Sequence, residues 1–335
     1  MLIIIPLLFV AIVFAVTFAE YRKVFYVRGI EATGFREYFF SLYPGLEKES
    51  FSCASGKESL YGLKIWYKGK IKGLIVLIHG YGLNMEHYLT QAEYLAKAGF
   101  IIVLFDGVGI GRSSGANIRG LPQHVTDACT VLDYVQSSRE LSSLPLLLYG
   151  HSWGGWAANA ASCLKSYPIE AILSVAGYYD SLGAMRASIR ARYGVLLGGV
   201  VMLPLAFYQR LAFGRTSGYT AVRGLKAAGC PALLVHSKND PVLPFKDNFE
   251  KIKKALQGRE NTGFWEVCGG NHNLGVPAGA DERCRQLRKL IQKNADDGLT
   301  QELWSLQMMV DEEMMKVFLD FYNDCIDTRT VDILT

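Results

Sequence analysis

The sequence has no CxxC pair, although it contains seven cysteines. An odd number without that spacing argues against a zinc site and against a complete disulfide framework. We therefore interpret the cysteines mainly as small buried residues of a protein in a reducing compartment. They are Cys53, Cys129, Cys163, Cys230, Cys268, Cys284 and Cys325.

Basic residues are not concentrated anywhere. The net charge is only +4 in 335 residues, and no long run of lysine or arginine carries it. Nucleic-acid-binding proteins need a basic patch, so we expect no nucleic-acid partner. Aromatic residues, by contrast, are plentiful, with 18 tyrosines and 17 phenylalanines. This composition excludes a disordered chain and predicts a substantial core.

Charged residues are absent from residues 2–19, where Thr17 is the only polar side chain. A helix of this length spans about 27 Å, which is close to the thickness of the hydrocarbon layer of a membrane. We predict a transmembrane anchor over residues 1–20. The alternative is a cleaved signal peptide, but no basic residue precedes the apolar run, and the run is longer than is usual for such a peptide.

The first basic residues, Arg22, Lys23 and Arg28, follow the apolar run. Positive charge collects on the cytoplasmic side of membrane helices, so we expect a single-pass protein whose remaining chain is cytoplasmic. This orientation agrees with the unpaired cysteines. Residues 21–57 carry no strong motif, and we interpret them as a juxtamembrane segment.

Short apolar runs alternate with helical patterns after this segment. A continuous apolar run is typical of a strand buried on both faces of a parallel sheet. Alternation of such strands with helices of about 10 to 15 residues predicts an α/β protein with a mostly parallel sheet. The expected strands are residues 73–78, 100–105, 144–149, 169–176, 231–236 and 263–268, after an early antiparallel strand at 59–68, and the expected helices are 88–98, 121–135, 153–166 and 303–325.

A long segment, residues 181–229, interrupts the alternation and exceeds one crossover helix. Residues 193–207 within it are strongly apolar, with arginines on both sides. We interpret the segment as a helical cap packed over the sheet. One alternative is a cap that also contacts lipid. The other is a second transmembrane helix, which is disfavoured because it would split the domain.

A G-x-S-x-G motif, Gly150 to Gly154, stands directly between an expected strand and an expected helix. In that context the serine, Ser152, occupies a strained turn that exposes its hydroxyl above the sheet, and the glycines let the strand and the helix approach closely. The start of the helix supplies positive potential for a developing oxyanion. The motif therefore predicts that Ser152 is a nucleophile rather than only a helix cap.

A serine nucleophile needs a base, and the chain has only six histidines. His272 lies in a glycine-rich loop after the last expected strand and alone comes late enough for the order serine, acid, histidine. Asp240, directly after another expected strand, is the predicted acid that orients the imidazole. Asp180, which follows the strand at 169–176, is the alternative acid.

Two backbone N–H groups are expected to form the oxyanion hole. One belongs to Trp153, directly after the nucleophile, and the other to Tyr81, in the loop after the strand at 73–78. The G-x-G-x-G loop that follows Asp106 lacks the register of a dinucleotide-binding turn. We expect Asp106 and Arg112 to hold that loop together by hydrogen bonds.

With these motifs in order, the chain resembles the α/β-hydrolase superfamily, in particular its monoacylglycerol lipase-like and serine aminopeptidase-like branch. The resemblance implies an eight-stranded, mostly parallel sheet with helices on both faces, a cap after the sixth strand and no cofactor. It also implies the triad Ser152, Asp240 and His272, with Tyr81 and Trp153 at the oxyanion hole. The motifs that carry it are LIHGYG at 77–82, FDGVGIGRSSG at 105–115, GHSWGG at 150–155, SKNDPVLP at 237–244 and GGNHN at 269–273.

The expected domain organisation follows from this pattern. The core comprises residues 58–180 and 230–335, and the cap comprises residues 181–229. The chain departs from the family in continuing well beyond His272, where residues 276–302 form a charged insertion that is expected to shape the mouth of the active site or an interface.

The sequence thus predicts a membrane-anchored hydrolase that cleaves carboxylic esters of lipid-like or acyl substrates through an acyl-enzyme. Peptide-bond cleavage, as in a serine peptidase or aminopeptidase, and acyl transfer use the same triad and are alternatives. A non-catalytic, membrane-localised scaffold is the alternative from another class of protein.

Overall fold

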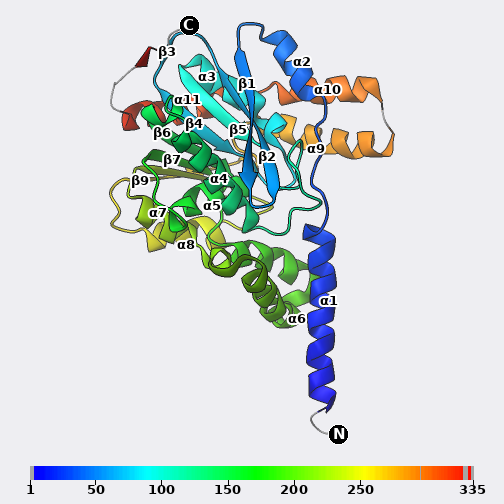
Figure 1. Cartoon of the computed structure of the whole chain (residues 1–335). Helices are drawn as coiled ribbons and strands as arrows, with labels where there is room; N and C mark the ends of the chain where they lie inside the picture. The colour runs from blue at the N-terminus through cyan, green and yellow to red at the C-terminus, as the bar shows by residue number, and fades with distance from the viewer. Residues whose placement is uncertain (1–3, 295, 327–330, 333–335) are drawn as a thin grey trace.

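The computed structural model describes residues 4–294, 296–326 and 331–332 (Figure 1). Its centre is an eight-stranded sheet with the order β1-β2-β5-β4-β6-β7-β8-β9. Strands β1 and β2 are antiparallel, β2 runs antiparallel to β5, and the other neighbours are parallel. The strands are β1 (Glu47–Ser55), β2 (Glu58–Trp66), β4 (Gly73–Ile78), β5 (Phe100–Phe105), β6 (Leu146–His151), β7 (Ile169–Val175), β8 (Ala232–Ser237) and β9 (Thr262–Val267). A separate pair joins β3 (Lys70–Ile71) to β10 (Val331–Asp332).

Helices cover both faces of this sheet, because its central strands are apolar on both sides (Figure 1). In β4, the alternate residues Leu74, Val76 and Ile78 pack into one core cluster, while Ile75 and Leu77 pack into the other. One cluster contains α4 (Gln123–Ser137), α5 (Trp153–Ala160), α7 (Ala221–Ala228) and α8 (Lys251–Ala255), and the other contains α2 (Phe35–Leu42), α3 (Leu89–Lys97) and α11 (Glu312–Cys325). The predicted mostly parallel eight-stranded sheet with helices on both faces is confirmed.

The sheet begins earlier than expected, since β1 lies inside the segment that we interpreted as juxtamembrane. Only Phe51 and Ser55 are buried among its residues, and it forms the outer edge of the sheet. An edge strand of this kind has no continuous apolar run, and for that reason the sequence pattern did not reveal it.

The C-terminal region also differs from the expectation. The helix expected over 303–325 is two helices, α10 (Asp297–Gln307) and α11, because Asp311 accepts a hydrogen bond from the N–H of Met314 and begins a new helix. The charged insertion is mostly the helix α9 (Ala278–Lys293), which packs against α10 through Cys284, Leu287 and Leu303. Figure 1 shows this pair projecting from one side of the core.

Helix α1 (Ile4–Phe25) extends downward from the core in Figure 1, and α6 (Ser181–Phe213) lies beside it. Helix α6 follows β7, which is the sixth strand of the main sheet, and it is broken at Gly194, whose φ is 74°. Asp180 and Thr220 form a bridge at the base of this excursion. By length and composition, α1 and residues 192–218 are each apolar enough to cross a membrane.

The loop after β5 is held by two buried carboxylates. Asp106 accepts hydrogen bonds from the N–H groups of Met85 and Arg112, each at 2.9 Å, so its expected role in holding the loop is confirmed. Asp127 in α4 accepts a hydrogen bond from the N–H of Val108 at 3.0 Å. Burial raises the pKa of Asp106 and of Asp127 to about 6 each, against the opposing effect of these hydrogen bonds.

A pH-dependent stability follows from Asp127. Because its pKa is raised on folding, the folded state binds the proton more tightly than the unfolded state, and the contribution of this carboxyl to stability falls as pH rises from about 4 to about 6. Asp127→Asn lacks this titration. We expect the free energy of unfolding of the wild type, relative to Asp127→Asn, to fall over that window by roughly 3 kcal/mol at most. Urea unfolding at several pH values measures this, with the exposed Asp320→Asn as control. A difference that does not change with pH would contradict it.

Candidate active site

Ser152 occupies the turn between β6 and α5, with φ 55° and ψ −111°. A Cβ atom added to Gly150 would lie 2.2 Å from the carbonyl oxygen of Gly154, and one added to Gly154 would lie 1.9 Å from the carbonyl oxygen of Ile78. Glycine is therefore required at both positions of the motif, because backbone fills the space of a side chain. The turn holds the hydroxyl of Ser152 at the carboxyl end of β6, where α5 begins.

His272 and Asp240 meet Ser152 at this edge of the sheet. The Nε2 atom of His272 lies 2.8 Å from the Oγ atom of Ser152, and its Nδ1 atom lies 2.7 Å from the Oδ2 atom of Asp240. With the proton on Nδ1, the imidazole donates to Asp240 and accepts from the hydroxyl of Ser152. The loops after β8 and β9 bring these two side chains to the end of β6. Asp180 lies elsewhere, where it accepts a hydrogen bond from the N–H of Gly183 and caps α6.

The side chain of Asp240 is fully buried, and its surroundings are arranged for a charged carboxylate. Its Oδ1 atom accepts hydrogen bonds from the N–H groups of Val242 and Leu243, at 2.8 and 2.9 Å. Burial alone would raise the pKa of Asp240, but the contact with His272 and these two hydrogen bonds hold that pKa below its ordinary value. Asp240 is thus ionised at neutral pH and can orient the imidazole without taking its proton.

The two expected oxyanion donors, Trp153 and Tyr81, line the same cavity as Ser152, and the side chains of both make hydrogen bonds elsewhere. The indole N–H of Trp153 donates to the carbonyl oxygen of Leu121 at 2.7 Å, and its ring stacks on His124 at 4.0 Å. The hydroxyl of Tyr81 donates to the carbonyl oxygen of Val24 at 3.2 Å. Within the described part of the chain, neither backbone N–H has a hydrogen-bond acceptor, as expected for the first N–H group of a helix at Trp153.

Three of the other histidines, His79, His124 and His236, are buried and make contacts near the site. His79 accepts a hydrogen bond from the N–H of Gly107, and burial lowers its pKa to about 4, so that it is neutral. His124 bonds to the carbonyl oxygen of His79. His236 lies 3.3 Å from Asp240, where burial lowers the pKa of its imidazole. No motif in the sequence indicated that His236 lies next to Asp240.

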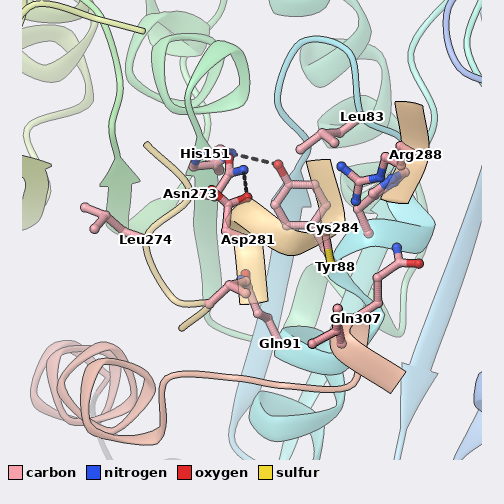
Figure 2. A pocket seen from close by; sticks show the side chains of 13 residues that line it. Leu83, Tyr88, Gln91, His151, Asn273, Leu274, Asp281, Cys284, Arg288 and Gln307 are labelled. Carbon is pink, nitrogen blue, oxygen red and sulfur yellow. Dashed lines mark hydrogen bonds between the residues drawn. The ribbon is translucent and has the colours of Figure 1, made fainter. Parts of the chain in front are cut away.

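A second hydrogen-bond chain runs behind His272. The N–H of Gly80 donates to the hydroxyl of Tyr88 at 2.9 Å, and that hydroxyl donates to the Nδ1 atom of His151 at 2.7 Å. The Nε2–H group of His151 donates in turn to the carbonyl oxygen of His272 at 3.1 Å. Figure 2 shows Tyr88 and His151 on the wall of a small cavity of about 50 Å³. This chain of hydrogen bonds joins the loops that carry Tyr81, Ser152 and His272.

The imidazole of His151 is suited to this linking position. Burial lowers the pKa of His151 to about 3, so it is neutral at physiological pH and offers one donor and one acceptor. No motif in the sequence indicated the partners of His151. Tyr88 lies in the helical segment after β4, and no motif in the sequence marks its contact with Gly80.

An apolar cavity of about 280 Å³ opens above Ser152. Ser152 and Trp153 form its floor, and Leu121, Tyr178 and Leu243 are among the residues that line it from the core. The walls come from α1 and α6. The nucleophile itself is buried, with 8% of its surface exposed.

Comparison with known proteins finds relatives by sequence and by structure. The family model described as serine aminopeptidase, S33, matches residues 69–193. The chain is 23% identical over 201 residues to the palmitoyl-protein thioesterase ABHD10 of Pongo abelii, a match that covers 56% of this chain and 63% of that protein. It is 26% identical over 206 residues to the lysophosphatidylserine lipase ABHD12 of Gallus gallus, covering 57% of this chain and 49% of the relative.

Among solved structures, the esterase Pf2001 of Pyrococcus furiosus has a TM-score of 0.58 at 16% identity, covering 90% of this chain and 98% of that one. The likeness shows a shared fold, and the sequence matches place the nucleophile turn inside the common region. The chain belongs to the α/β-hydrolase superfamily. Because the matched part spans less than two thirds of the length of these curated relatives, their activities are not carried over to this α/β-hydrolase by likeness alone.

The two candidate acids of this α/β-hydrolase can be separated by the reactivity of Ser152. Asp240→Asn removes the charge that orients the imidazole, so we expect the rate of fluorophosphonate labelling at Ser152 to fall about 10³- to 10⁴-fold. Asp180→Asn keeps the helix cap and serves as the matched control, with an unchanged rate expected. Labelling followed by mass spectrometry measures both. Loss of labelling in Asp180→Asn instead would show that the acid is misassigned.

The hydrogen-bond chain through Tyr88 should contribute measurably to the stability of the protein. Tyr88→Phe removes one hydroxyl and leaves the N–H of Gly80 and the Nδ1 atom of His151 without their partner, and each unpaired buried group costs about 1–3 kcal/mol. We expect the free energy of unfolding to fall by roughly 2–6 kcal/mol in urea titrations. Tyr94→Phe is the control, since its hydroxyl makes no hydrogen bond among the described residues. Equal effects of the two substitutions would refute the role of this chain.

Proposed function

We propose that this protein is a serine hydrolase that cleaves carboxylic esters of lipid-like or acyl substrates through an acyl-enzyme. Ser152 is the nucleophile, His272 the general base and Asp240 the acid that orients it. The observation that carries the proposal is the unbroken hydrogen-bond chain from Asp240 through His272 to Ser152, with distances of 2.7 and 2.8 Å, beneath an apolar cavity.

Acylation begins when the Oγ atom of Ser152 attacks the ester carbonyl carbon and His272 Nε2 takes its proton. The carbonyl oxygen becomes an oxyanion, which accepts hydrogen bonds from the N–H groups of Trp153 and Tyr81. Such a donor is typically worth about 3–4 kcal/mol in the transition state. The tetrahedral intermediate then collapses, and His272 returns the proton to the leaving alcohol. The charge on Asp240 stabilises the imidazolium in between.

Deacylation repeats the same steps with water as the nucleophile. His272 takes a proton from the water as its oxygen attacks the acyl carbon, and the intermediate expels the Oγ atom of Ser152, which recovers the proton. The carboxylic acid leaves and the enzyme is restored. An alcohol in place of the water gives acyl transfer, which differs only in the acceptor.

The apolar cavity favours an acyl group over a peptide as substrate. An aminopeptidase usually binds the amino terminus of its peptide with acidic side chains. Glu20 is the acidic residue that lines the cavity, and it is paired with Lys23 at 2.7 Å and with Arg192 at 3.3 Å. The curated names of the relatives, a thioesterase and a lipase, also refer to acyl substrates. Thioesters belong in the substrate panel for the same reason.

The long helices suggest where the hydrolase acts. We propose that α1 anchors the protein in a membrane as a single span, with the catalytic residues on the cytoplasmic side, where Arg22, Lys23 and Arg28 lie. We further propose that residues 181–229 form a cap over the active site, since side chains of α6 line the cavity above Ser152.

The decisive test is hydrolysis by the full-length protein in detergent. We expect p-nitrophenyl acyl esters to be cleaved by the wild type, and Ser152→Ala to lower kcat at least 10³-fold because the nucleophile is lost. Aminoacyl arylamides, assayed in parallel, should be cleaved far more slowly than the esters. Unchanged ester cleavage in Ser152→Ala would disprove the proposal, and a preference for the arylamides would favour a peptidase.

A further inference from the structure

Helix α1 is fixed rigidly to the catalytic part of the molecule. The hydroxyl of Tyr21 donates to the carbonyl oxygen of Arg119 at 2.9 Å, and a Cβ on the neighbouring Gly120 would collide with that hydroxyl. The carbonyl oxygen of Phe25 accepts from the N–H of Arg119 at 2.9 Å. Tyr21 and Phe25 each expose only 4% of their surface. The last turns of α1 are thus part of the folded core rather than a tether on a flexible linker.

The inward face of these turns lines the cavity above Ser152. Its members are Thr17, Glu20, Tyr21, Val24 and Phe25. Their spacing of three, four, seven and eight residues from Thr17 places them on one face of a helix. The hydroxyl of Tyr81, whose backbone is the proposed oxyanion donor, bonds to α1 at Val24. The helix that is apolar enough to cross a membrane therefore also forms one wall of the site.

Helix α6 forms the facing wall with Met185, Ile189 and Leu205, among other residues. The two helices are joined to each other as well as to the core. The hydroxyl of Tyr208 donates to the carbonyl oxygen of Phe14 at 2.6 Å, and the ring centroids of Tyr208 and Phe18 are 5.0 Å apart. The seam between α1 and α6 thus runs from the apolar surface of the molecule toward the cavity.

The outer surfaces of both helices are strongly apolar. Leu196 exposes 87% of its surface, Leu203 75% and Leu211 75% on α6, and most of α1 before Thr17 is exposed and apolar. Because its last turns are docked on the core, only the part of α1 before Thr17 is free to lie in a bilayer. A bilayer that surrounds this part also reaches α6, since Tyr208 of α6 bonds to Phe14.

We propose that α1 is a wall of an acyl-chain binding site, and that the acyl chain of a membrane-resident ester enters this site from the bilayer along the seam between α1 and α6. The inference rests on the proposed function for the chemistry at Ser152. It goes further in assigning substrate selection to the helix that serves as anchor, and in naming the membrane as the source of the substrate.

The first test measures acyl-chain selectivity with the full-length protein in phosphatidylcholine vesicles. Val24→Trp places a large side chain on the cavity wall, and Val24→Phe is a milder variant in case the first does not fold. Val16→Trp, on the exposed face of α1, is the matched control. We expect the kcat/KM ratio for the palmitoyl over the butyryl p-nitrophenyl ester to fall at least tenfold in Val24→Trp and to stay within twofold in Val16→Trp. Equal ratios in both variants would overturn the proposal.

The second test does not depend on catalysis. Ser152→Ala in vesicles is irradiated with a palmitoylglycerol whose chain carries a diazirine, and the adducts are mapped by mass spectrometry. Adducts at Tyr21, Val24 and Met185, reduced at least fivefold by adding Val24→Trp, support the site. Adducts confined to residues 4–16 and 195–203 would overturn it, even where esters prove not to be substrates.

The source of the acyl chain is tested with the same probe. We expect at least tenfold more early adduct in the cavity when the probe is in the same vesicles as the protein than when it is in a separate vesicle population. Equal yields from the two preparations would overturn entry from the bilayer. Failure of the proposed function is distinct, because wild type and Ser152→Ala would then hydrolyse esters equally.

Discussion

The close packing of backbone at the turn from β6 into α5, against the end of β4, determines the geometry of the site. Gly154 leaves no room for a side chain against Ile78, and Gly150 leaves none against Gly154. This contact forces Ser152 into a positive φ and raises its hydroxyl at the end of the sheet. Such strain persists only where the surroundings over-determine it. Here the buried strands on either side supply that support, because β4 and β7 pair with β6.

Hydrogen bonds extend this constraint to the other loops. On one side, His272 joins the hydroxyl of Ser152 to Asp240, which two backbone N–H groups keep charged. On the other side, Tyr88 and His151 tie the loop of Gly80 to the backbone of His272. Asp240, His272 and Ser152 are thus held in one arrangement by hydrogen bonds. This arrangement suits the proposed hydrolysis, because donors that must first reorient stabilise an oxyanion less well.

The features that were predicted correctly from the sequence are those that depend on residues close together in the chain. The central strands are continuous apolar runs, and β4 and β5 begin and end at the expected residues. The glycine spacing around Ser152 also has a local cause. What the sequence did not reveal depends on distant contacts: β1 pairs at an edge where few residues are buried, and α6 breaks at Gly194 without a motif. The docking of α1 was missed for the same reason, because a uniformly apolar helix does not indicate which face will be covered.

The bridge between Asp180 and Thr220 brings the two ends of the α6 excursion together. At the sheet, β7 and β8 are therefore joined as if by a short connection, whatever the length or composition of the segment between Asp180 and Thr220. Loop insertions closed in this way cost little stability, and they leave β7 and β8 in register. The pairing of the strands that carry the turn at Ser152 therefore does not depend on the conformation of residues 181–219.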